Sequence, residues 1–271
     1  MSRTWFITGT SSGFGRAMTE TLLARGDRVA ATLRTPAQLD ALKQRYGDAL
    51  WLAALDVTDT PAVHTTMNRA FAELGRIDVI VSNAGYGLAG AAEELSDDEI
   101  VRQLNTNVIG SIQLTRAALP HLRRQGGGRI LQLSSMGGQI AFPGLSLYHA
   151  SKWAIEGFIE AVRQEVSGFN IEFTLIEPGA AQTGFRDKGM VMAQAMPEYE
   201  ETPAHALRAS FPWIGDAQKM VHEMIASVDR SPAPQRLALG SDAYRLVKSA
   251  LEQRLAELEA SKAISLSTDL T

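Results

Sequence analysis

The sequence has no cysteine among its 271 residues. Disulfide bonds, thiolate zinc sites and cysteine nucleophiles are therefore excluded for this chain. The five histidines, His64, His121, His149, His205 and His222, show no ligand-like spacing. We accordingly expect no metal site.

The sequence also lacks an excess of basic residues and any long apolar run. It has 26 lysines and arginines against 30 aspartates and glutamates, and its isoelectric point is about 5.8. This balance gives no electrostatic reason to expect nucleic acid or an anionic membrane as a partner, although charge alone excludes neither. No segment reaches the roughly 20 apolar residues that span a bilayer, and no signal peptide precedes the first strand-like segment. We expect a cytoplasmic protein with neither partner.

Strand-like and helix-like segments alternate along the chain. Strands are predicted at 4–8, 28–33, 49–55, 77–81, 129–133, 170–176 and 236–239. Helices are predicted at 16–25, 61–74, 96–123, around 148–167 and at 242–259. Strands separated by helix-length segments favour a parallel sheet with helices on both faces, and right-handed crossovers make it doubly wound. We therefore predict an α/β protein: a single-domain Rossmann fold over residues 1–271 with a doubly wound, seven-stranded parallel sheet.

One segment, at about 183–213, departs from the alternation. It is rich in Met, Pro and Ala and is long for a connection in a compact domain. Long irregular connections tend to be lids or binding loops, so a substrate lid is predicted here. Arg186 and Lys188 lie within it and are interpreted as solvated side chains.

A glycine-rich turn follows the first predicted strand and opens a helix. It reads Thr8-Gly9-x-x-x-Gly13-x-Gly15, which is not the commoner Gly-x-Gly-x-x-Gly spacing. Glycines let the backbone approach a pyrophosphate, and the helix N-terminus offers free N–H groups and the positive end of the helix dipole. The strand–turn–helix context therefore predicts dinucleotide binding.

The second predicted strand lacks the acidic residue that usually follows it in an NAD site. Leu33 and then Arg34 stand there instead. An acid bonds the ribose hydroxyls of NAD, whereas an arginine fork binds the 2′-phosphate of NADP with charge-assisted hydrogen bonds. Ser12 offers a further hydroxyl to the same phosphate. The pattern favours NADP(H) as the cofactor.

Three residues near the middle of the chain carry the chemistry. Tyr148 and Lys152 stand four residues apart, which on a helix places them on one face, and Ser135 precedes Tyr148 by thirteen residues. A lysine ammonium beside a phenol favours the phenolate, so the pKa of Tyr148 is predicted to be lowered. Such a group can exchange a proton with a substrate oxygen.

These motifs, in this order, resemble the short-chain dehydrogenase/reductase family in its one-domain branch, over roughly residues 4–183. The segments that carry the resemblance are Thr8-Gly9-x-x-x-Gly13-x-Gly15, Asp56-Val57, Asn83-Ala84-Gly85, Asn105-Thr106-Asn107, Ser135, Tyr148 with Lys152, and Pro178-Gly179 with Thr183. Residues 31–34 are most similar to the NADP-dependent 17β-hydroxysteroid dehydrogenase type 1 and retinol dehydrogenase-like members, which implies a cofactor preference and no particular substrate.

The resemblance implies an oxidoreductase with Asn107, Ser135, Tyr148 and Lys152 as catalytic residues. Tyr148 protonates the developing alkoxide, Ser135 hydrogen-bonds the carbonyl oxygen, and Lys152 holds the nicotinamide ribose. Asn107 keeps a water between Lys152 and solvent. The cofactor-binding residues that the resemblance implies are Gly9, Ser11, Ser12, Gly13, Phe14, Gly15, Arg34, Asp56, Val57, Asn83, Ala84, Gly85, Tyr148, Lys152, Pro178, Gly179 and Thr183.

The substrate is predicted to lie beyond the carboxyl ends of the strands. Tyr86 and Phe142, with Ser135 and Tyr148, are the predicted substrate-binding residues, and their apolar neighbours favour a hydrophobic ketone or secondary alcohol, although plain packing explains the apolar residues equally well. Alternatives are a 3-oxoacyl-carrier-protein reductase and a non-catalytic NADP-binding sensor; sensors typically lose the tyrosine or the lysine, and both are present. The family further implies a homodimer or homotetramer.

Overall fold

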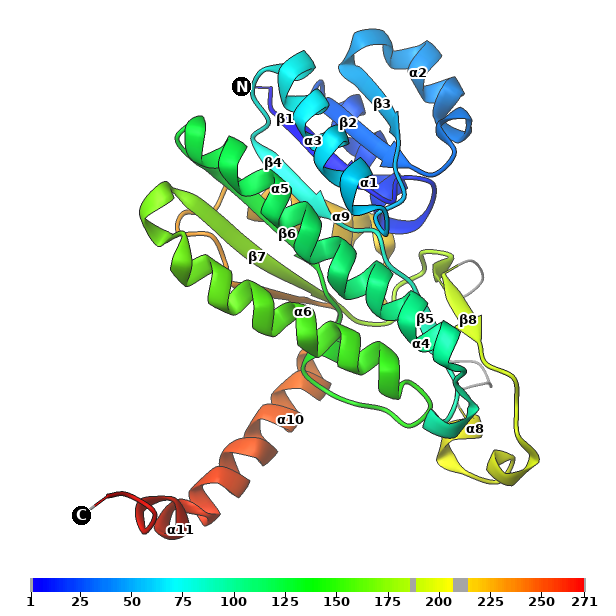
Figure 1. Ribbon diagram of the computed structural model, residues 1–271, viewed down its shortest axis with the longest axis vertical. Helices are drawn as coiled ribbons and strands as arrows, with labels where there is room; N and C mark the ends of the chain where they lie inside the picture. The colour runs from blue at the N-terminus through cyan, green and yellow to red at the C-terminus, as the bar shows by residue number, and fades with distance from the viewer. Residues whose placement is uncertain (1, 186–188, 207–213, 271) are drawn as a thin grey trace.

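The computed structural model describes residues 2–185, 189–206 and 214–270 (Figure 1). A seven-stranded, all-parallel sheet forms its centre, with the strand order β3-β2-β1-β4-β6-β7-β9. The strands are β1 (Thr4–Thr8), β2 (Arg28–Leu33), β3 (Leu50–Ala54), β4 (Val79–Ser82), β6 (Gly128–Leu133), β7 (Ile171–Pro178) and β9 (Arg236–Leu239). The predicted fold class is confirmed, because the order reverses at β1 as in a doubly wound sheet.

Both faces of the sheet are covered by helices, which explains why the strands read as continuous apolar runs. In β1, Trp5 and Ile7 face one core and Phe6 faces the other. The first core packs against α1 (Gly13–Ala24), α2 (Asp40–Tyr46) and α9 (Ala217–Ser227). The second packs against α3 (Thr60–Leu74), α5 (Gly110–Arg124) and α6 (Ser146–Glu165). Each large apolar side chain buried in this way contributes about 1.5–3 kcal/mol.

The helix predicted at 96–123 is divided in the structure. It consists of α4 (Asp97–Leu104), a π-helical turn at Asn105–Ile109 and α5. Ser96 caps α4 and forms the expected capping box with Glu99. Single π turns inside α-helices are often found at functional sites. Asn107, one of the predicted catalytic residues, lies in this turn.

The segment at 183–213 is tied to the body by a two-stranded parallel sheet that the sequence did not predict. The strand β5 (Gly87–Ala89), which follows the Asn83-Ala84-Gly85 motif, pairs with β8 (Met190–Met192). The short helix α8 (Pro203–Ala206) follows. Residues 186–188 and 207–213, including Arg186 and Lys188, lie outside the described residues.

The C-terminal helices α10 (Ser241–Ala260) and α11 (Lys262–Leu266) extend from the body of the domain (Figure 1). Leu251, Leu255 and Leu258 of α10 are 49%, 58% and 62% exposed, so they do not pack internally within one chain. None of the described helices is long and apolar enough to cross a membrane.

Candidate active site

The glycine turn has the geometry of a phosphate-binding loop. Gly9 and Gly13 have φ angles of +71° and +58°, a backbone conformation that favours glycine. At Gly15 a Cβ would lie 2.5 Å from the Gly9 carbonyl oxygen, so no side chain fits there. The helix α1 begins here, and its N-cap residue Ser12 makes no side-chain capping bond. The first N–H groups of α1 therefore remain available to an anion such as a pyrophosphate, and the residues fit a dinucleotide.

The segment after β4 supports this turn from the adjacent strand. The backbone N–H groups of Asn83 and Ala84 both donate to Thr8 Oγ1 at 3.0 Å. The Asn83 side chain donates to the carbonyl oxygens of Thr8 and Gly9 at 2.8 and 3.1 Å. Thr8 lies at the end of β1 and Ser82 at the end of β4, so parallel pairing brings these motifs to one edge of the sheet.

The segment after β7 reaches the same edge. A Cβ on Gly13 would lie 3.7 Å from the carbonyl oxygen of Thr183, so the segment that begins with Pro178-Gly179 ends beside the glycine turn. The Gly179 N–H donates to Leu239 at 2.8 Å, which continues the pairing of β7 with β9.

Arg34 follows β2 and Asp56 follows β3, and both residues are exposed. A hydrogen bond from the backbone of Thr58 lowers the pKa of Asp56, and the Arg34 guanidinium adds to this effect. Val57 next to it is buried in the core. The Arg34 side chain is therefore an exposed cation at the end of β2, where the sequence predicts the contact with the 2′-phosphate.

Asn107 is buried and holds the backbone of Tyr86 with both ends of its amide. Its Nδ2 donates to the Tyr86 carbonyl at 2.8 Å, and its Oδ1 accepts from the Tyr86 N–H at 3.0 Å. Nδ2 also donates to Ser151 Oγ, at 3.1 Å, on α6. Asn107 thus links the π turn, the backbone just before β5 and the helix that carries Tyr148.

Ser135, Tyr148 and Lys152 come together in the structure. Ser135 precedes the short 3₁₀ turn Met136–Gly138 after β6, and its hydroxyl accepts the Gly137 N–H at 3.0 Å. Ser135 also hydrogen-bonds the side chain of Tyr148. The Lys152 ammonium lies 5.7 Å from the centroid of the Tyr148 ring and donates to the Leu133 carbonyl at 3.0 Å. The predicted i, i+4 placement on α6 is therefore correct.

The predicted lowering of the Tyr148 pKa is wrong for this structure. Burial raises the pKa of Tyr148 above its ordinary value, and the hydrogen bond with Ser135 opposes the rise. Burial also lowers the pKa of Lys152 to about 8, against the opposing effect of the Glu156 carboxylate. The sequence showed the neighbouring cation but not the desolvation, which dominates here. A phenol that remains protonated at neutral pH is suited to donate a proton.

The side chain of His149, the residue after Tyr148 on α6, has a structural role. Its Nδ1 bonds the Gly137 carbonyl at 2.9 Å, and its Nε2 accepts from the Phe142 N–H at 2.8 Å. A ring that accepts at Nε2 donates from Nδ1, so the imidazole is neutral, and burial lowers the pKa of His149. His149 fixes the loop that carries Phe142.

The predicted substrate residues lie around this loop and the start of β5. The Phe142 ring lies 5.7 Å from that of His149, which is itself 5.9 Å from Tyr148. Burial raises the pKa of Tyr86, whose side chain lies near α4. The ring of Phe185, which sequence reasoning did not single out, lies 6.3 Å from Tyr148. Phe185 follows Thr183 by two residues, and that closeness to the predicted cofactor segment was the available signal.

The structure describes every residue predicted for the cofactor and catalytic sites. Among the described residues, no three His, Asp or Glu side chains are grouped as a metal site. Ser11 and Ser12 are exposed in the glycine turn, and Phe14 packs on the core beneath it. Sequence reasoning did not find Thr8 as a support for Asn83, since that contact joins two strands.

Comparisons with known proteins agree with this geometry. A family profile described as short chain dehydrogenase matches residues 3–191. The chain is similar to the oxidoreductase BOA17 of Botryotinia fuckeliana, with 36% identity over 99% of this chain and 100% of that protein. It is also similar to human 17-beta-hydroxysteroid dehydrogenase type 1, with 32% identity over 80% of this chain and 68% of that protein. The crystal structure of a short-chain dehydrogenase from Streptomyces avermitilis superposes with a TM-score of 0.92 at 37% identity, over 99% of this chain and 100% of that one.

Proposed function

The chain belongs to the short-chain dehydrogenase/reductase family, and we propose that it is an NADP(H)-dependent reductase acting on a hydrophobic ketone or the corresponding secondary alcohol. The observation that carries the proposal is the meeting of Ser135, Tyr148 and Lys152 at the edge of the sheet that also holds the glycine turn. Oxidoreductases of this family act on carbonyl and CH–OH groups.

NADPH, when bound, supplies a hydride to the carbonyl carbon of the substrate. The protein supplies position and electrostatics. Ser135 hydrogen-bonds the carbonyl oxygen, on which negative charge develops. Tyr148, kept protonated by burial, donates its proton to that oxygen. The charge of Lys152 stabilises the phenolate that forms. Asn107 holds the Tyr86 backbone and Ser151, which lies on the same helix as Tyr148.

The preference for NADPH rests on Arg34. Charge-assisted hydrogen bonds contribute about 1.5–3 kcal/mol each, which corresponds to about tenfold or more in affinity. We expect the protein to use NADPH at least about tenfold better than NADH in kcat/KM. Arg34→Ala is expected to raise the KM for NADPH about tenfold and to leave that for NADH unchanged.

The matched control for this variant is Arg45→Ala, which removes an exposed arginine from the neighbouring helix α2 without touching the end of β2. Steady-state kinetics with both cofactors measures the effect. Equal efficiency of the wild type with NADPH and NADH contradicts the role of Arg34.

The apolar side chains near Tyr148 support a hydrophobic substrate. Phe185 lies against Tyr148, Phe142 lies on the His149 side, and Met190 Sδ approaches Gly87 so closely that a Cβ there would lie 2.6 Å away. We propose that the segment at 183–213, which contributes Phe185 and Met190, covers the substrate.

A panel of aliphatic, aromatic and acyl-thioester ketones, followed by NADPH absorbance, tests the proposal. Turnover of hydrophobic ketones supports it. Turnover confined to acyl-carrier-protein thioesters favours the 3-oxoacyl reductase instead. Tight binding of NADPH without turnover of any carbonyl, or of any alcohol with NADP⁺, points to a sensor.

A further inference from the structure

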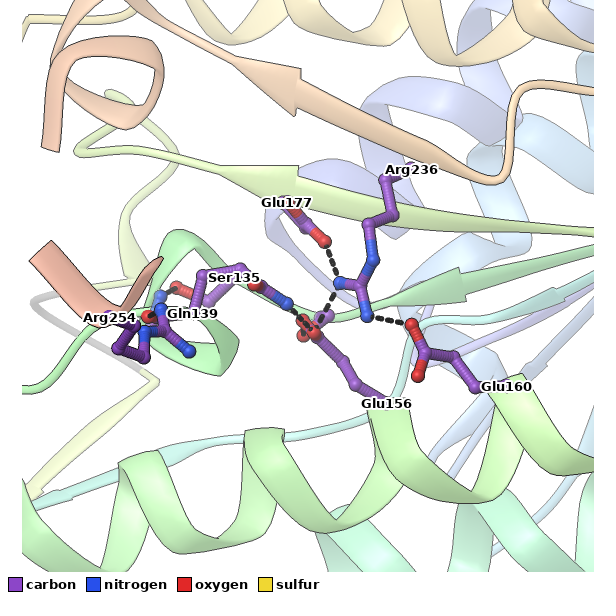
Figure 2. A network of polar contacts seen from close by, with 9 residues as sticks. Ser135, Gln139, Glu156, Glu160, Glu177, Arg236 and Arg254 are labelled. Carbon is purple, nitrogen blue, oxygen red and sulfur yellow. Dashed lines mark hydrogen bonds and ion pairs between the residues drawn. The ribbon is translucent and has the colours of Figure 1, made fainter. Parts of the chain in front are cut away.

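One helical turn beyond Lys152 on α6, a buried carboxylate holds the turn that carries Ser135 (Figure 2). Glu156 is 3% exposed and lies one helical turn beyond Lys152. Its Oε1 accepts the Ser134 hydroxyl at 2.5 Å, and its Oε2 accepts the side-chain amide of Gln139. The two donors flank Ser135, so one carboxylate grips the turn before and after the serine.

The glycines of this turn are explained by the same helix. A Cβ on Gly138 would lie 2.0 Å from Glu156 Oε1, and a Cβ on Gly137 would lie 2.8 Å from His149 Nδ1. His149 and Glu156 are two helical turns apart on one face of α6. The turn is therefore pressed onto α6 at two points, and only glycine permits that approach.

Arg236 of β9 fixes Glu156 from the other side. Its Nη1 donates to both Glu156 and Glu177, and its Nη2 donates to Glu160, as the dashed lines in Figure 2 show. Glu177 is 2% exposed, and burial, with the neighbouring Glu156 carboxylate, raises its pKa to about 7. The Glu156 side chain is thus held by a guanidinium whose planar fork favours carboxylates.

We propose that Glu156 is a positioning residue for the reaction: it fixes the Ser135 turn against α6, while Arg236 holds Glu156 in place. The inference rests on the proposed function, in which Ser135 hydrogen-bonds the substrate oxygen and Lys152 stabilises the Tyr148 phenolate. A shift of about 1 Å in a catalytic group can reduce the rate about a hundredfold. The carboxylate of Glu156 also opposes the fall in the Lys152 pKa.

The test compares Glu156→Gln with Glu160→Gln. Glu160 contacts the same Arg236 but is about half exposed and lies two helical turns from Lys152. Glu156→Gln is expected to lower kcat about tenfold or more and leave the affinity for NADPH, measured by fluorescence titration, within about twofold. In a plot of kcat against pH, the fall in kcat at alkaline pH (the alkaline limb) should move to lower pH in Glu156→Gln, because the variant lacks the carboxylate that raises the pKa of Lys152. Glu160→Gln should leave both kcat and the position of the alkaline limb unchanged.

A second variant keeps the Glu156 carboxylate and removes only its two hydrogen bonds to the turn. Ser134→Ala with Gln139→Met is expected to lower kcat about as much as Glu156→Gln does, without moving the alkaline limb. Should Glu156→Gln fail to fold, this variant alone decides the positioning role. An unchanged kcat in the double variant, or equal behaviour of the two glutamate variants at every pH, overturns the inference.

Hydrogen exchange of the peptide around 134–142 provides a readout without turnover. The N–H groups of Gly138 and Gln139 donate within the turn at 2.9 Å, so a loosened turn exchanges several-fold faster. Faster exchange in Ser134→Ala with Gln139→Met, but not in Glu160→Gln, supports the positioning role even if no ketone is reduced. In that case the proposed function fails and the structural role of Glu156 stands. Unchanged hydrogen exchange in the variant Ser134→Ala with Gln139→Met overturns the positioning role of Glu156.

Discussion

Tyr148→Phe is expected to lower the rate of ketone reduction about a thousandfold or more and to leave NADPH affinity within about threefold. The variant keeps the ring and its packing but removes the proton donor, and general acid catalysis typically contributes about 10²–10⁴-fold. Burial keeps the Tyr148 phenol protonated at neutral pH, so the wild type holds the proton that the variant lacks. Steady-state turnover and fluorescence titration of NADPH measure the two quantities.

Tyr244→Phe is the matched control for this prediction. Tyr244 lies on α10 and is 66% exposed, so its hydroxyl faces water and its loss should change neither quantity. Near-normal turnover of Tyr148→Phe would show that another group protonates the substrate oxygen and that the proposed mechanism is wrong.

Lys152→Met is expected to lower reductase activity about a hundredfold. In the transition state, the phenolate forms near an ammonium that lies 5.7 Å from the ring centroid. At an effective dielectric constant near 20, a pair of unit charges at that distance is worth about 3 kcal/mol. Turnover at saturating NADPH measures the loss, with Lys248→Met, on the exposed face of α10, as the control.

The same substitution is expected to cost little stability near neutral pH. Burial lowers the pKa of Lys152 from 10.5 to about 8, so its charged form costs the folded state on the order of 3 kcal/mol. Removing the ammonium relieves this cost but leaves the Leu133 carbonyl without its donor, a loss of about 1–3 kcal/mol. The two effects offset each other.

The pH dependence of this stability has a definite sign. The unfolded chain binds a proton at Lys152 up to about pH 10.5, and the folded chain only up to about pH 8. The wild type should therefore gain stability relative to Lys152→Met as the pH rises from about 8 to about 10.5, and lose it as the pH falls. Thermal unfolding of both proteins across this range measures the difference. A constant difference would show that Lys152 is not desolvated.

Much of the site could be predicted because it depends on local patterns. The glycine turn could be predicted because its requirements are local. The positive φ angles of Gly9 and Gly13 and the crowding at Gly15 all favour glycine within a few residues of each other. The placement of Tyr148 and Lys152 on one face could be predicted from their four-residue spacing, because residues four apart lie about one turn apart on an α-helix. Parallel pairing then brings the ends of β1, β4, β6 and β7 to one edge without further information.

Contacts between distant segments were less accessible. The helix predicted at 96–123 contains a π turn, in which Asn107 bonds the backbone of Tyr86, 21 residues away. The pairing of β5 with β8 joins two three-residue strands that are too short to give a period. The role of Glu156 was likewise not accessible from the sequence, since Arg236, which holds its carboxylate, is 80 residues away.

The sequence by itself determined the doubly wound sheet, the glycine turn after β1 and the placement of Tyr148 and Lys152 on one helix face, because each follows from periodicity or short spacing. The catalytic roles of Ser135, Tyr148 and Lys152 are predictions that the family resemblance implies. Only the tertiary structure decided how those groups titrate. A neighbouring cation is visible in a sequence, but desolvation depends on everything that covers the phenol and the ammonium, and it reversed the predicted direction of the Tyr148 pKa. The same dependence on packing decided that Glu156, buried and held by Arg236, grips the serine turn.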